Sequence, residues 1–466
     1  MHRSCADINL RDYKTLMPWI WDSILRHHDR YDFRDMLLEY GISLDNYVKA
    51  QKNHDPYLLH SAVMPIAKEV VRRITARNLM VRPPRIEMKV DVTTGKLRPI
   101  GCEEALHQVL DSTAVYASAD IWRRRIAPQQ VSSIAGRGPL HGAKMICNWV
   151  REDNRAIRYA EAHKVVYAPK CKYHVKIDVT QCFPSARFEI FMSLFRRDCA
   201  NKDLIWLWKS LFNLHRVGGY EGFLIGSWIS QQAMQYMLSF VFRHVMGLSN
   251  ERRGKRIKLV THMITFMDDM LITGTNRKNL KSAVRSAVKF TKNTLGLNIK
   301  PNWHIKELEK EPIDMMGYVI HRNGKMTIRS RNLIHGRRLI LAYYREHALT
   351  VQQARRLSSY KGFFKHTKIN YVRKWKKDDK RLQVKEAFDY AASVVSRYDR
   401  EANNDTIQRK STIQRTAGTG QVHAAPGREG GCMDQARHTT ESGQRGRRCV
   451  VCQGSLFADD ADPGGN

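Results

Sequence analysis

The sequence has no long apolar run and few cysteines. No apolar stretch reaches the roughly 18 residues that would span a bilayer. The N-terminus leads into charged residues rather than into the apolar core of a signal peptide. Nine cysteines are scattered over 466 residues, and only Cys449 and Cys452 form a CxxC pair. We therefore expect a cytoplasmic protein with reduced cysteines and no membrane contact.

Acidic residues are scarce relative to basic ones. Lys and Arg total 79 against 45 Asp and Glu, which gives a formal charge of +34 and a pI near 10.0. From Arg322 to Lys377 there are sixteen bases and one acid, Glu346. A solvated helical face is the ordinary explanation for such a run. Because counter-charges are almost absent here, we expect a polyanionic partner, namely nucleic acid.

The chain is long enough for two or three domains. Apolar residues at a spacing of three to four predict helices in the N-terminal part, for example at Tyr13–His27 and Ala62–Ala76. The last 66 residues hold ten glycines, and eight bases balance eight acids. We expect four parts: an N-terminal helical extension (1–80), an α+β domain (81–328), a basic helical segment (329–400) and a disordered tail (401–466).

Two segments present carboxylates next to apolar runs. Alternating apolar residues in 173–178 predict a strand that ends at Asp178. Two apolar runs in 263–272 flank Asp268 and Asp269, which predicts a tight hairpin with acids at its tip. Adjacent like charges repel and are tolerated where a divalent cation neutralises them. The three acids are therefore the expected catalytic ligands of two Mg²⁺ ions, with Mn²⁺ as a substitute.

An ordered series of motifs resembles the bacterial reverse transcriptase family, within the right-hand polymerases. The matching segments are Asp178–Ser185, Phe266–Asp269 (the Tyr-x-Asp-Asp box, with Phe in place of Tyr), Leu295–Lys300, Met316–Tyr318, Gly95–Ile100 and Gly136–Gly138. The resemblance implies fingers, a palm with an antiparallel sheet and a helical thumb. It also implies RNA-directed DNA polymerase activity that uses an RNA template, a cDNA or primer strand and dNTPs.

The resemblance also implies roles for individual residues. The metal ligands would be Asp178, Val179, Asp268 and Asp269. The nucleotide-binding residues would be Lys96, Arg98, Phe183, Ile225, Gly226, Gln231 and Lys300, and the primer and template would contact Met316, Gly317, Tyr318, Arg337, Arg338, Arg355 and Arg356. Phe183 stands at the family's steric gate, where an aromatic ring excludes a 2′-hydroxyl; a core aromatic is the alternative. Surface ion pairs are the alternative for Lys96 and Arg98.

The segment from Ile225 to Gln231 points to one group within the reverse transcriptases. Most reverse transcriptases carry Gln-Gly-x-x-x-Ser-Pro where this chain has Ile225-Gly226 followed by Ser230-Gln231. The pattern resembles diversity-generating retroelement reverse transcriptases, which copy a template repeat with errors at adenines. A Gln here could hydrogen-bond near the incoming nucleotide, whereas Ile225 cannot. The lost contact would reduce the discrimination between correctly and incorrectly paired nucleotides by about 1–2 kcal/mol. An ordinary apolar strand residue is the alternative for Ile225. A separately encoded accessory protein is an expected partner.

Two alternatives to a diversity-generating enzyme stay open. Phe266 in the catalytic box and an apparent insertion at 151–172 also fit phage-defence reverse transcriptases. A catalytically inactive, basic RNA-binding scaffold is an alternative of another class, although such a scaffold has no use for three clustered acids. Cys449 and Cys452, with Cys432, His423 or His438, form a weak candidate zinc site.

Overall fold

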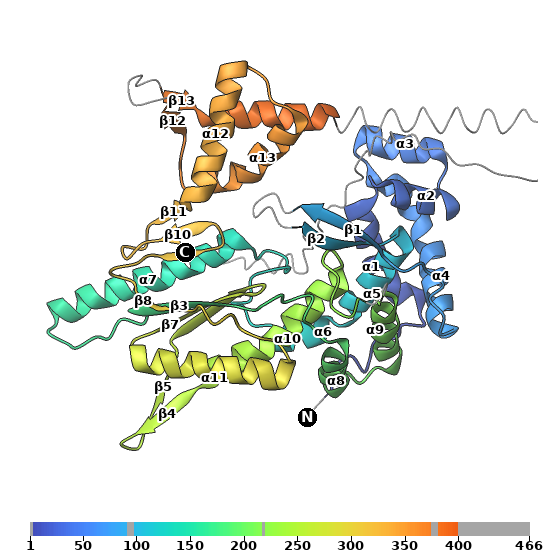
Figure 1. Ribbon diagram of the computed structural model, residues 1–466. Helices are drawn as coiled ribbons and strands as arrows, with labels where there is room; N and C mark the ends of the chain where they lie inside the picture. The colour runs from blue at the N-terminus through green and yellow to red at the C-terminus, as the bar shows by residue number, and fades with distance from the viewer. Residues whose placement is uncertain (1–2, 91–96, 217–219, 374–380, 399–466) are drawn as a thin grey trace, which may run out of the picture. The chain divides into compact units, whose positions relative to one another are not determined.

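The computed structural model describes residues 3–90, 97–216, 220–373 and 381–398 (Figure 1). These residues form two compact units: residues up to Met316 together with Ile320–Lys325, and Gly317–Val319 together with the residues from Met326 onward. Lys96, the expected tail at 401–466 and the CxxC pair all lie outside the described residues. Among the described residues, no helix is both long and apolar enough to cross a membrane, and the six cysteines there are all free.

The first unit contains most of the described secondary structure. Its helices are α1 (Tyr13–His27), α2 (Tyr31–Glu39), α3 (Leu44–Asn53), the 3₁₀ helix η1 (Pro56–Ala62), α4 (Val63–Thr75), α5 (Ala105–Ala117), α6 (Ala119–Arg125), α7 (Pro139–Ala162), α8 (Phe188–Asp198), α9 (Lys202–Leu214), α10 (Trp228–Gly247) and α11 (Arg277–Leu295). Its strands are β1 (Arg85–Val90), β2 (Leu97–Cys102), β3 (Tyr173–Asp178), β4 (Ser249–Arg252), β5 (Lys255–Lys258), β6 (His262–Phe266), β7 (Asp269–Gly274), β8 (Ile305–Glu307) and β9 (Ile313–Met315).

The N-terminal helices share their core with the rest of the first unit. Helix α1 begins where the Asp12 carboxylate accepts the Lys14 N–H at 3.1 Å. Its buried face packs against α4 and α5. Buried residues of α1 and α4 join those of α5, α8, α9 and α10 in one apolar cluster. The two helices expected near Tyr13–His27 and Ala62–Ala76 are confirmed as α1 and α4.

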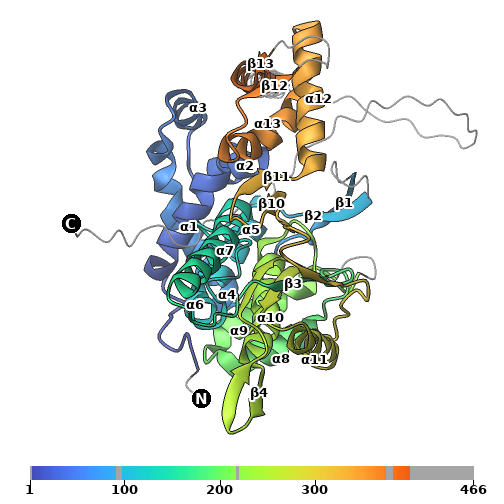
Figure 2. The ribbon, with the colours of Figure 1, turned by 90° about the vertical axis from the view of Figure 1, so that its left-hand side faces the viewer.

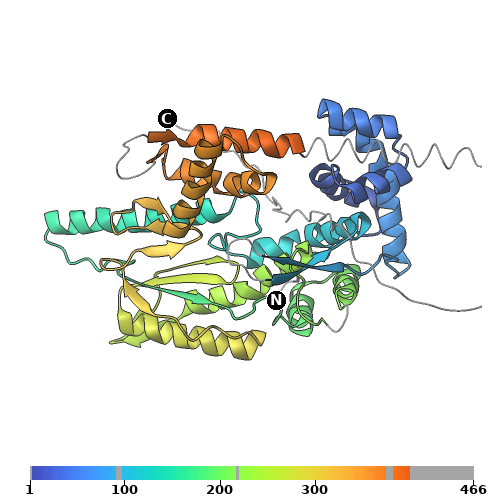
Figure 3. The same ribbon diagram turned by 45° about the horizontal axis from the view of Figure 1, so that its top comes forward.

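A four-stranded antiparallel sheet with the order β6-β7-β3-β8 forms the centre of the first unit. Figures 1 and 3 show α7 on one face of this sheet and α11 on the other. Met263, Met270 and Ile272 belong to the main apolar cluster, whereas Ile264 and Leu271 alternate with them and are buried on the opposite face. Because both faces are covered, the strands carry near-continuous apolar runs that end at the acids.

Two hairpins lie at the margins of the first unit. Strands β1 and β2 pair antiparallel, with Lys89 opposite Arg98. Strands β4 and β5 form a second hairpin after α10, and Figures 1 and 2 show it projecting away from the sheet. All four residues of β5 are exposed.

The second unit is a small helical domain. Its elements are β10 (Tyr318–Ile320), β11 (Met326–Ile328), α12 (Ser330–Glu346), α13 (Val351–His366), β12 (Tyr371–Arg373), β13 (Arg381–Gln383) and a helix over 384–398. Thr350 and Gln353 form a capping box at the start of α13. A side chain at Gly336 would begin 2.6 Å from the Phe364 ring, so this glycine permits the close packing of α12 on α13. The segment expected to be helical also contains the β12–β13 pair.

Candidate active site

The register of the central sheet places three carboxylates at one end of it. Asp178 is the last residue of β3 and lies opposite Asp269, the first residue of β7. Asp269 also pairs with Phe266 across the β6–β7 hairpin, which leaves Met267 and Asp268 as its two connecting residues. The expected strand end and the expected hairpin with acids at its tip are therefore both confirmed.

The turn of this hairpin is held by residues from outside it. Met267 has a φ of +53°, a conformation that costs a side-chain-bearing residue about 1–3 kcal/mol. The Met267 N–H donates to Ser132 Oγ at 2.9 Å, and the Gln235 amide contacts the Met267 sulfur at 3.5 Å. The Gln235 amide also donates to Ser132 Oγ. These contacts hold the turn in a conformation that its own sequence does not favour.

The loop before α7 pairs with the edge of β6. The Thr265 N–H donates to the Gln129 carbonyl at 3.0 Å, and the Val131 N–H donates to the Thr265 carbonyl at 3.0 Å. Gln130 is fully buried, and its amide donates to the Gln235 carbonyl of α10 at 2.9 Å. The loop, the hairpin and α10 are therefore one hydrogen-bonded assembly behind the acids.

Two lysines balance two of the three acids. Lys300 Nζ lies 2.6 Å from Asp178 Oδ1, and Lys176 Nζ lies 2.8 Å from Asp269 Oδ2. No lysine or arginine of the described residues forms an ion pair with Asp268. Burial, and then the charge of Asp178, raise the pKa of Asp268 above its ordinary value. The acid cluster therefore holds more negative charge than its neighbours neutralise.

Backbone contacts fix the segment that carries Lys300. The Lys300 N–H donates to the Asp178 carbonyl at 2.9 Å, and the Thr180 N–H donates to the Asn298 carbonyl at 2.7 Å. Val179, an expected metal ligand, has a buried side chain, and its N–H donates to the Asp268 carbonyl at 3.3 Å. The structure thus places Val179 between the two acid-bearing segments.

The segment around Ile225 connects the sheet to the β1–β2 hairpin. The Phe223 N–H donates to the carbonyl of Phe183 at 2.9 Å, and the Gly101 N–H donates to the carbonyl of Ile225 at 2.8 Å. Phe183 and Ile225 are both half-buried. Gly226 has a φ of +101°, and a Cβ there would lie 2.9 Å from the Gly101 carbonyl oxygen, so only glycine fits this approach.

Gln231 is buried in the network behind the acids. Its Oε1 accepts a hydrogen bond from Ser133 Oγ at 2.9 Å, and the Gln232 amide donates to the Ser133 carbonyl at 2.8 Å. The sequence suggested nucleotide binding for Gln231, and in the structure its side chain contacts the loop before α7. A proline at this position would lack the contact.

The remaining expected residues are spread over both units. In the first unit, Arg98 is exposed on β2. Met316 is buried against Gly142, and a Cβ on Gly142 would lie 2.6 Å from the Met316 sulfur. In the second, Gly317 has a φ of +83°, and the buried Tyr318 ring lies 5.0 Å from that of Phe363.

The four arginines expected to contact primer or template differ in their surroundings. Arg337 donates to the Arg373 carbonyl at 2.8 Å, and the Arg355 guanidinium lies 4.8 Å from the centre of the Tyr398 ring. Arg338 is exposed and Arg356 is half-buried. Arg337 and Arg355 therefore also have packing roles within the second unit.

Strand-end carboxylates on an antiparallel sheet covered by helices define the palm of a right-hand polymerase. The family model described as reverse transcriptase (RNA-dependent DNA polymerase) matches residues 88–320. The chain therefore belongs to the reverse transcriptase family, and it is an RNA-directed DNA polymerase, a nucleotidyltransferase that uses an RNA template and nucleotide substrates. Enzymes of this family use divalent metal ions. Family membership sets aside the alternative of an inactive scaffold.

Two solved structures of telomerases are similar to the chain. The telomerase from Candida albicans, in complex with a TWJ fragment of telomeric RNA, shares 9% identity, with 82% of this chain and 77% of that chain covered and a TM-score of 0.37. The apo telomerase from Candida tropicalis shares 10% identity, with 83% and 81% covered and a TM-score of 0.37. No curated protein matches the sequence.

Ser132, Lys176 and Gln235 are residues near the acids that sequence reasoning missed. Ser132 provides a test of the support for the turn. In Ser132→Ala, the Met267 N–H and the Gln235 amide lose a shared acceptor in a buried place, which costs about 1–3 kcal/mol. We expect a lower melting temperature and slower primer extension. Ser393→Ala, which removes one exposed hydroxyl that donates to the Tyr390 carbonyl, is the matched control. Equal behaviour of the two variants in melting and extension assays would contradict a supporting role for Ser132.

Proposed function

We propose that Asp178, Asp268 and Asp269 hold two Mg²⁺ ions for RNA-templated DNA synthesis. The observation that carries this proposal is the strand register, which sets Asp178 opposite Asp269 beside the Asp268 turn. Oxygen donors suit Mg²⁺, and Asp268 has no lysine or arginine partner among the described residues, so its charge is left for a cation to neutralise. Bound metal would activate the attacking 3′-hydroxyl and stabilise the leaving pyrophosphate. Val179 supports this site through its backbone contact with Asp268.

The neighbouring residues have distinct parts in the proposed reaction. Lys176 and Lys300 are paired with Asp269 and Asp178 in the metal-free chain and must release these acids when cations bind. Lys300 would then be available as the proton donor to pyrophosphate. Phe183 would lie under the incoming sugar and exclude a 2′-hydroxyl.

Substrate strands and the triphosphate would be held by basic and turn residues. Lys96 and Arg98 are proposed to contact the triphosphate, with Ile225, Gly226 and Gln231 shaping the nucleotide site. The Met316–Tyr318 turn and the arginines of α12 and α13 would hold the primer and template, chiefly through phosphate contacts. Arg338 is the exposed member of that arginine set.

Primer extension by the Asp268→Asn variant tests the proposed site. The substitution removes a charged ligand and leaves the basic surfaces unchanged, so activity with Mg²⁺ should fall about a hundredfold or more while RNA affinity is retained. Asp45→Asn is the control, because Asp45 forms only an exposed pair with Lys49 on α3. Normal extension by Asp268→Asn would overturn the assignment of the site.

We further propose that the enzyme is error-prone and acts in a diversity-generating retroelement with a separately encoded accessory protein. The support is Ile225 and Gln231, where most relatives have Gln and Pro. The Ile225 backbone is bonded to Gly101, and its apolar side chain offers no hydrogen bond to a nucleotide. Without this hydrogen bond the enzyme would discriminate less well between correct and incorrect nascent base pairs.

A phage-defence role is the second candidate, and two observations favour it. Phe266 replaces the usual Tyr, and residues 151–172 form the last turns of α7 and the loop after it. That loop is anchored, since Asp153 accepts hydrogen bonds from the Tyr167 hydroxyl at 2.6 Å and from the Cys171 N–H at 2.6 Å.

Error spectra distinguish the two candidates. Wild-type protein copying a defined RNA should misincorporate chiefly opposite template adenine. Ile225→Gln adds a hydrogen-bonding group at nearly constant volume, and a gain of about 1.4 kcal/mol in discrimination would lower errors about tenfold. Sequencing of the cDNA measures the distribution of errors over the four template bases and the error rate of each protein. Rare or evenly distributed wild-type errors would favour the phage-defence role, and adenine errors unchanged in Ile225→Gln would refute the proposed mechanism.

A further inference from the structure

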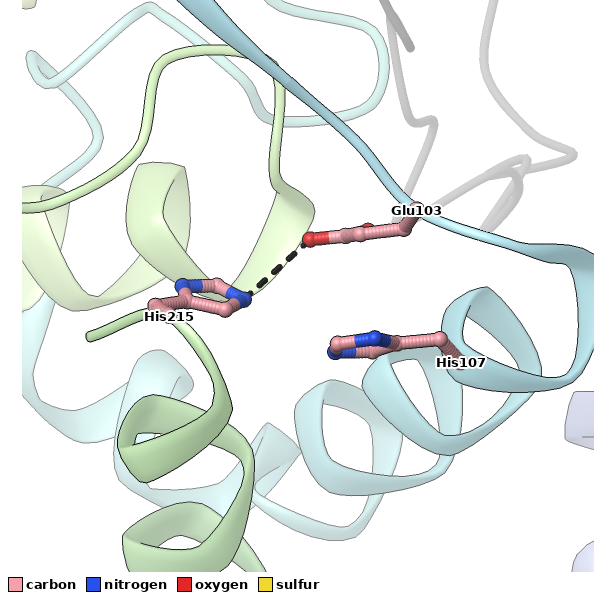
Figure 4. Close-up of side chains that lie close together, drawn as sticks. All are labelled: Glu103, His107 and His215. Carbon is pink, nitrogen blue, oxygen red and sulfur yellow. Dashed lines mark ion pairs between the residues drawn. The ribbon is translucent and has the colours of Figure 1, made fainter. Parts of the chain in front are cut away.

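A second group of acids and imidazoles is buried away from the catalytic carboxylates. Glu103 follows β2, His107 and Asp111 are one turn apart on α5, and His215 follows α9. Their exposed fractions are 5%, 0%, 1% and 1%. Figure 4 shows the side chains of Glu103, His107 and His215 converging from these three segments. Four ionisable side chains in one dry place require a partner that balances their charge.

The spacing of the donor atoms suits one small cation. One donor atom from each of Glu103, His107 and His215 lies within 4.8 Å of the other two. Glu103 Oε1 lies 3.3 Å from His215 Nε2, and His107 Nε2 lies 3.8 Å from Asp111 Oδ1. Ligands at about 2.0–2.1 Å from a tetrahedral Zn²⁺ are about 3.3–3.4 Å apart. One pair of donors already has this separation, and the other exceeds it slightly.

Five buried atoms of the cluster lack a well-directed hydrogen bond among the described residues, although Glu103 Oε1 and His215 Nε2 face each other as an ion pair. The five atoms are Glu103 Oε1, His107 Nε2, Asp111 Oδ1 and both ring nitrogens of His215. Each buried polar atom left unpaired costs about 1–3 kcal/mol, so such a group indicates an absent ion or water. The opposite atoms are held in place: His107 Nδ1 lies 3.3 Å from the Arg82 carbonyl, and Asp111 Oδ2 accepts from Ser227 Oγ at 3.3 Å. Contacts of this kind orient metal ligands.

Without a cation the cluster is electrostatically frustrated. Two buried carboxylates, Glu103 and Asp111, share one water-poor space with the imidazoles of His107 and His215. Either protons shared within the cluster or one divalent cation can relieve this conflict, and a cation would take one donor atom from each side chain.

We propose that Glu103, His107 and His215 bind a structural Zn²⁺ ion, and that Asp111, which is not among the donors within 4.8 Å of one another, moves its carboxylate to become the fourth ligand when the ion binds. Two imidazole nitrogens and two carboxylates form a donor set that zinc accepts, whereas Mg²⁺ prefers oxygen alone. The +2 charge balances two carboxylates. A cavity of about 20 Å³, with room for about one water, borders Glu103 and Asp111, and neither His107 nor His215 lines it.

The proposed zinc clasp, formed by these four residues, would stabilise the Ile225 segment. It joins the end of β2 and α5 to the end of α9, and Asp111 holds Ser227, the residue that caps α10. Ile225 and Gly226 immediately precede Ser227, and Ile225 is bonded to Gly101 of β2. The ion would therefore act on the fold rather than on the reacting atoms.

Zinc content of the full chain tests this proposal. The protein should carry Cys449→Ser, Cys452→Ser and Asp268→Asn, so that neither the CxxC pair nor the intact catalytic cluster contributes. Elemental analysis after dialysis should give one zinc per chain. His107→Gln should remove the zinc, whereas His174→Gln, which changes a buried histidine bonded to the Glu311 carbonyl at 3.0 Å, should retain it.

Two further measurements avoid dependence on the folding of the His107 variant. A strong chelator should lower the melting temperature of the triple-substituted protein, and added Zn²⁺ alone should restore it. Co²⁺ in place of zinc should give the intense visible absorption of a four-coordinate site. If the protein contains no zinc, and neither chelator nor Zn²⁺ changes its melting temperature, then shared protons balance the cluster. Zinc retained in His107→Gln would place the metal elsewhere, and either result overturns the proposal.

Discussion

Repulsion between three carboxylates is the constraint on which the centre of this molecule depends. The β3–β7 register sets Asp178 against Asp269, and the two-residue turn adds Asp268. Like charges so placed oppose folding unless other groups balance them. Lys176 and Lys300 do so for two of the acids, and no lysine or arginine of the described residues pairs with Asp268. A divalent cation is the partner that would complete the charge balance.

The rest of the first unit supports this concentration of charge. Ser132 and Gln235 hold the strained Met267, and the buried amides of α10 tie the hairpin to the loop before α7. The same helix begins at Ser227, which is bonded to Asp111 of the proposed zinc clasp. Helix α10 therefore connects the two ionic centres, one beside the catalytic turn and the other behind the Ile225 segment.

Local pattern and order of motifs were sufficient to predict the acid-bearing elements. The strand ending at Asp178 and the hairpin around Asp268 follow from apolar runs adjacent in sequence. The supporting contacts were not predictable in this way. Ser132 and Met267 are 135 positions apart, and the zinc clasp joins Glu103 to His215, so only the folded chain brings them together. The bond between Gln231 and Ser133, 98 positions apart, was likewise not predictable from local pattern.

The central claim is that divalent cations complete the charge balance of the three aspartates. Anomalous scattering from crystals of the full chain with Mn²⁺, a primed RNA template and a dNTP, the primer lacking its 3′-hydroxyl, tests it most directly. The account predicts manganese peaks within coordination distance of Asp178 and the Asp268–Asp269 pair, with Lys176 and Lys300 displaced from their carboxylates. Crystals that show the bound nucleotide but no manganese at these acids, with both lysine pairs intact, would contradict the account.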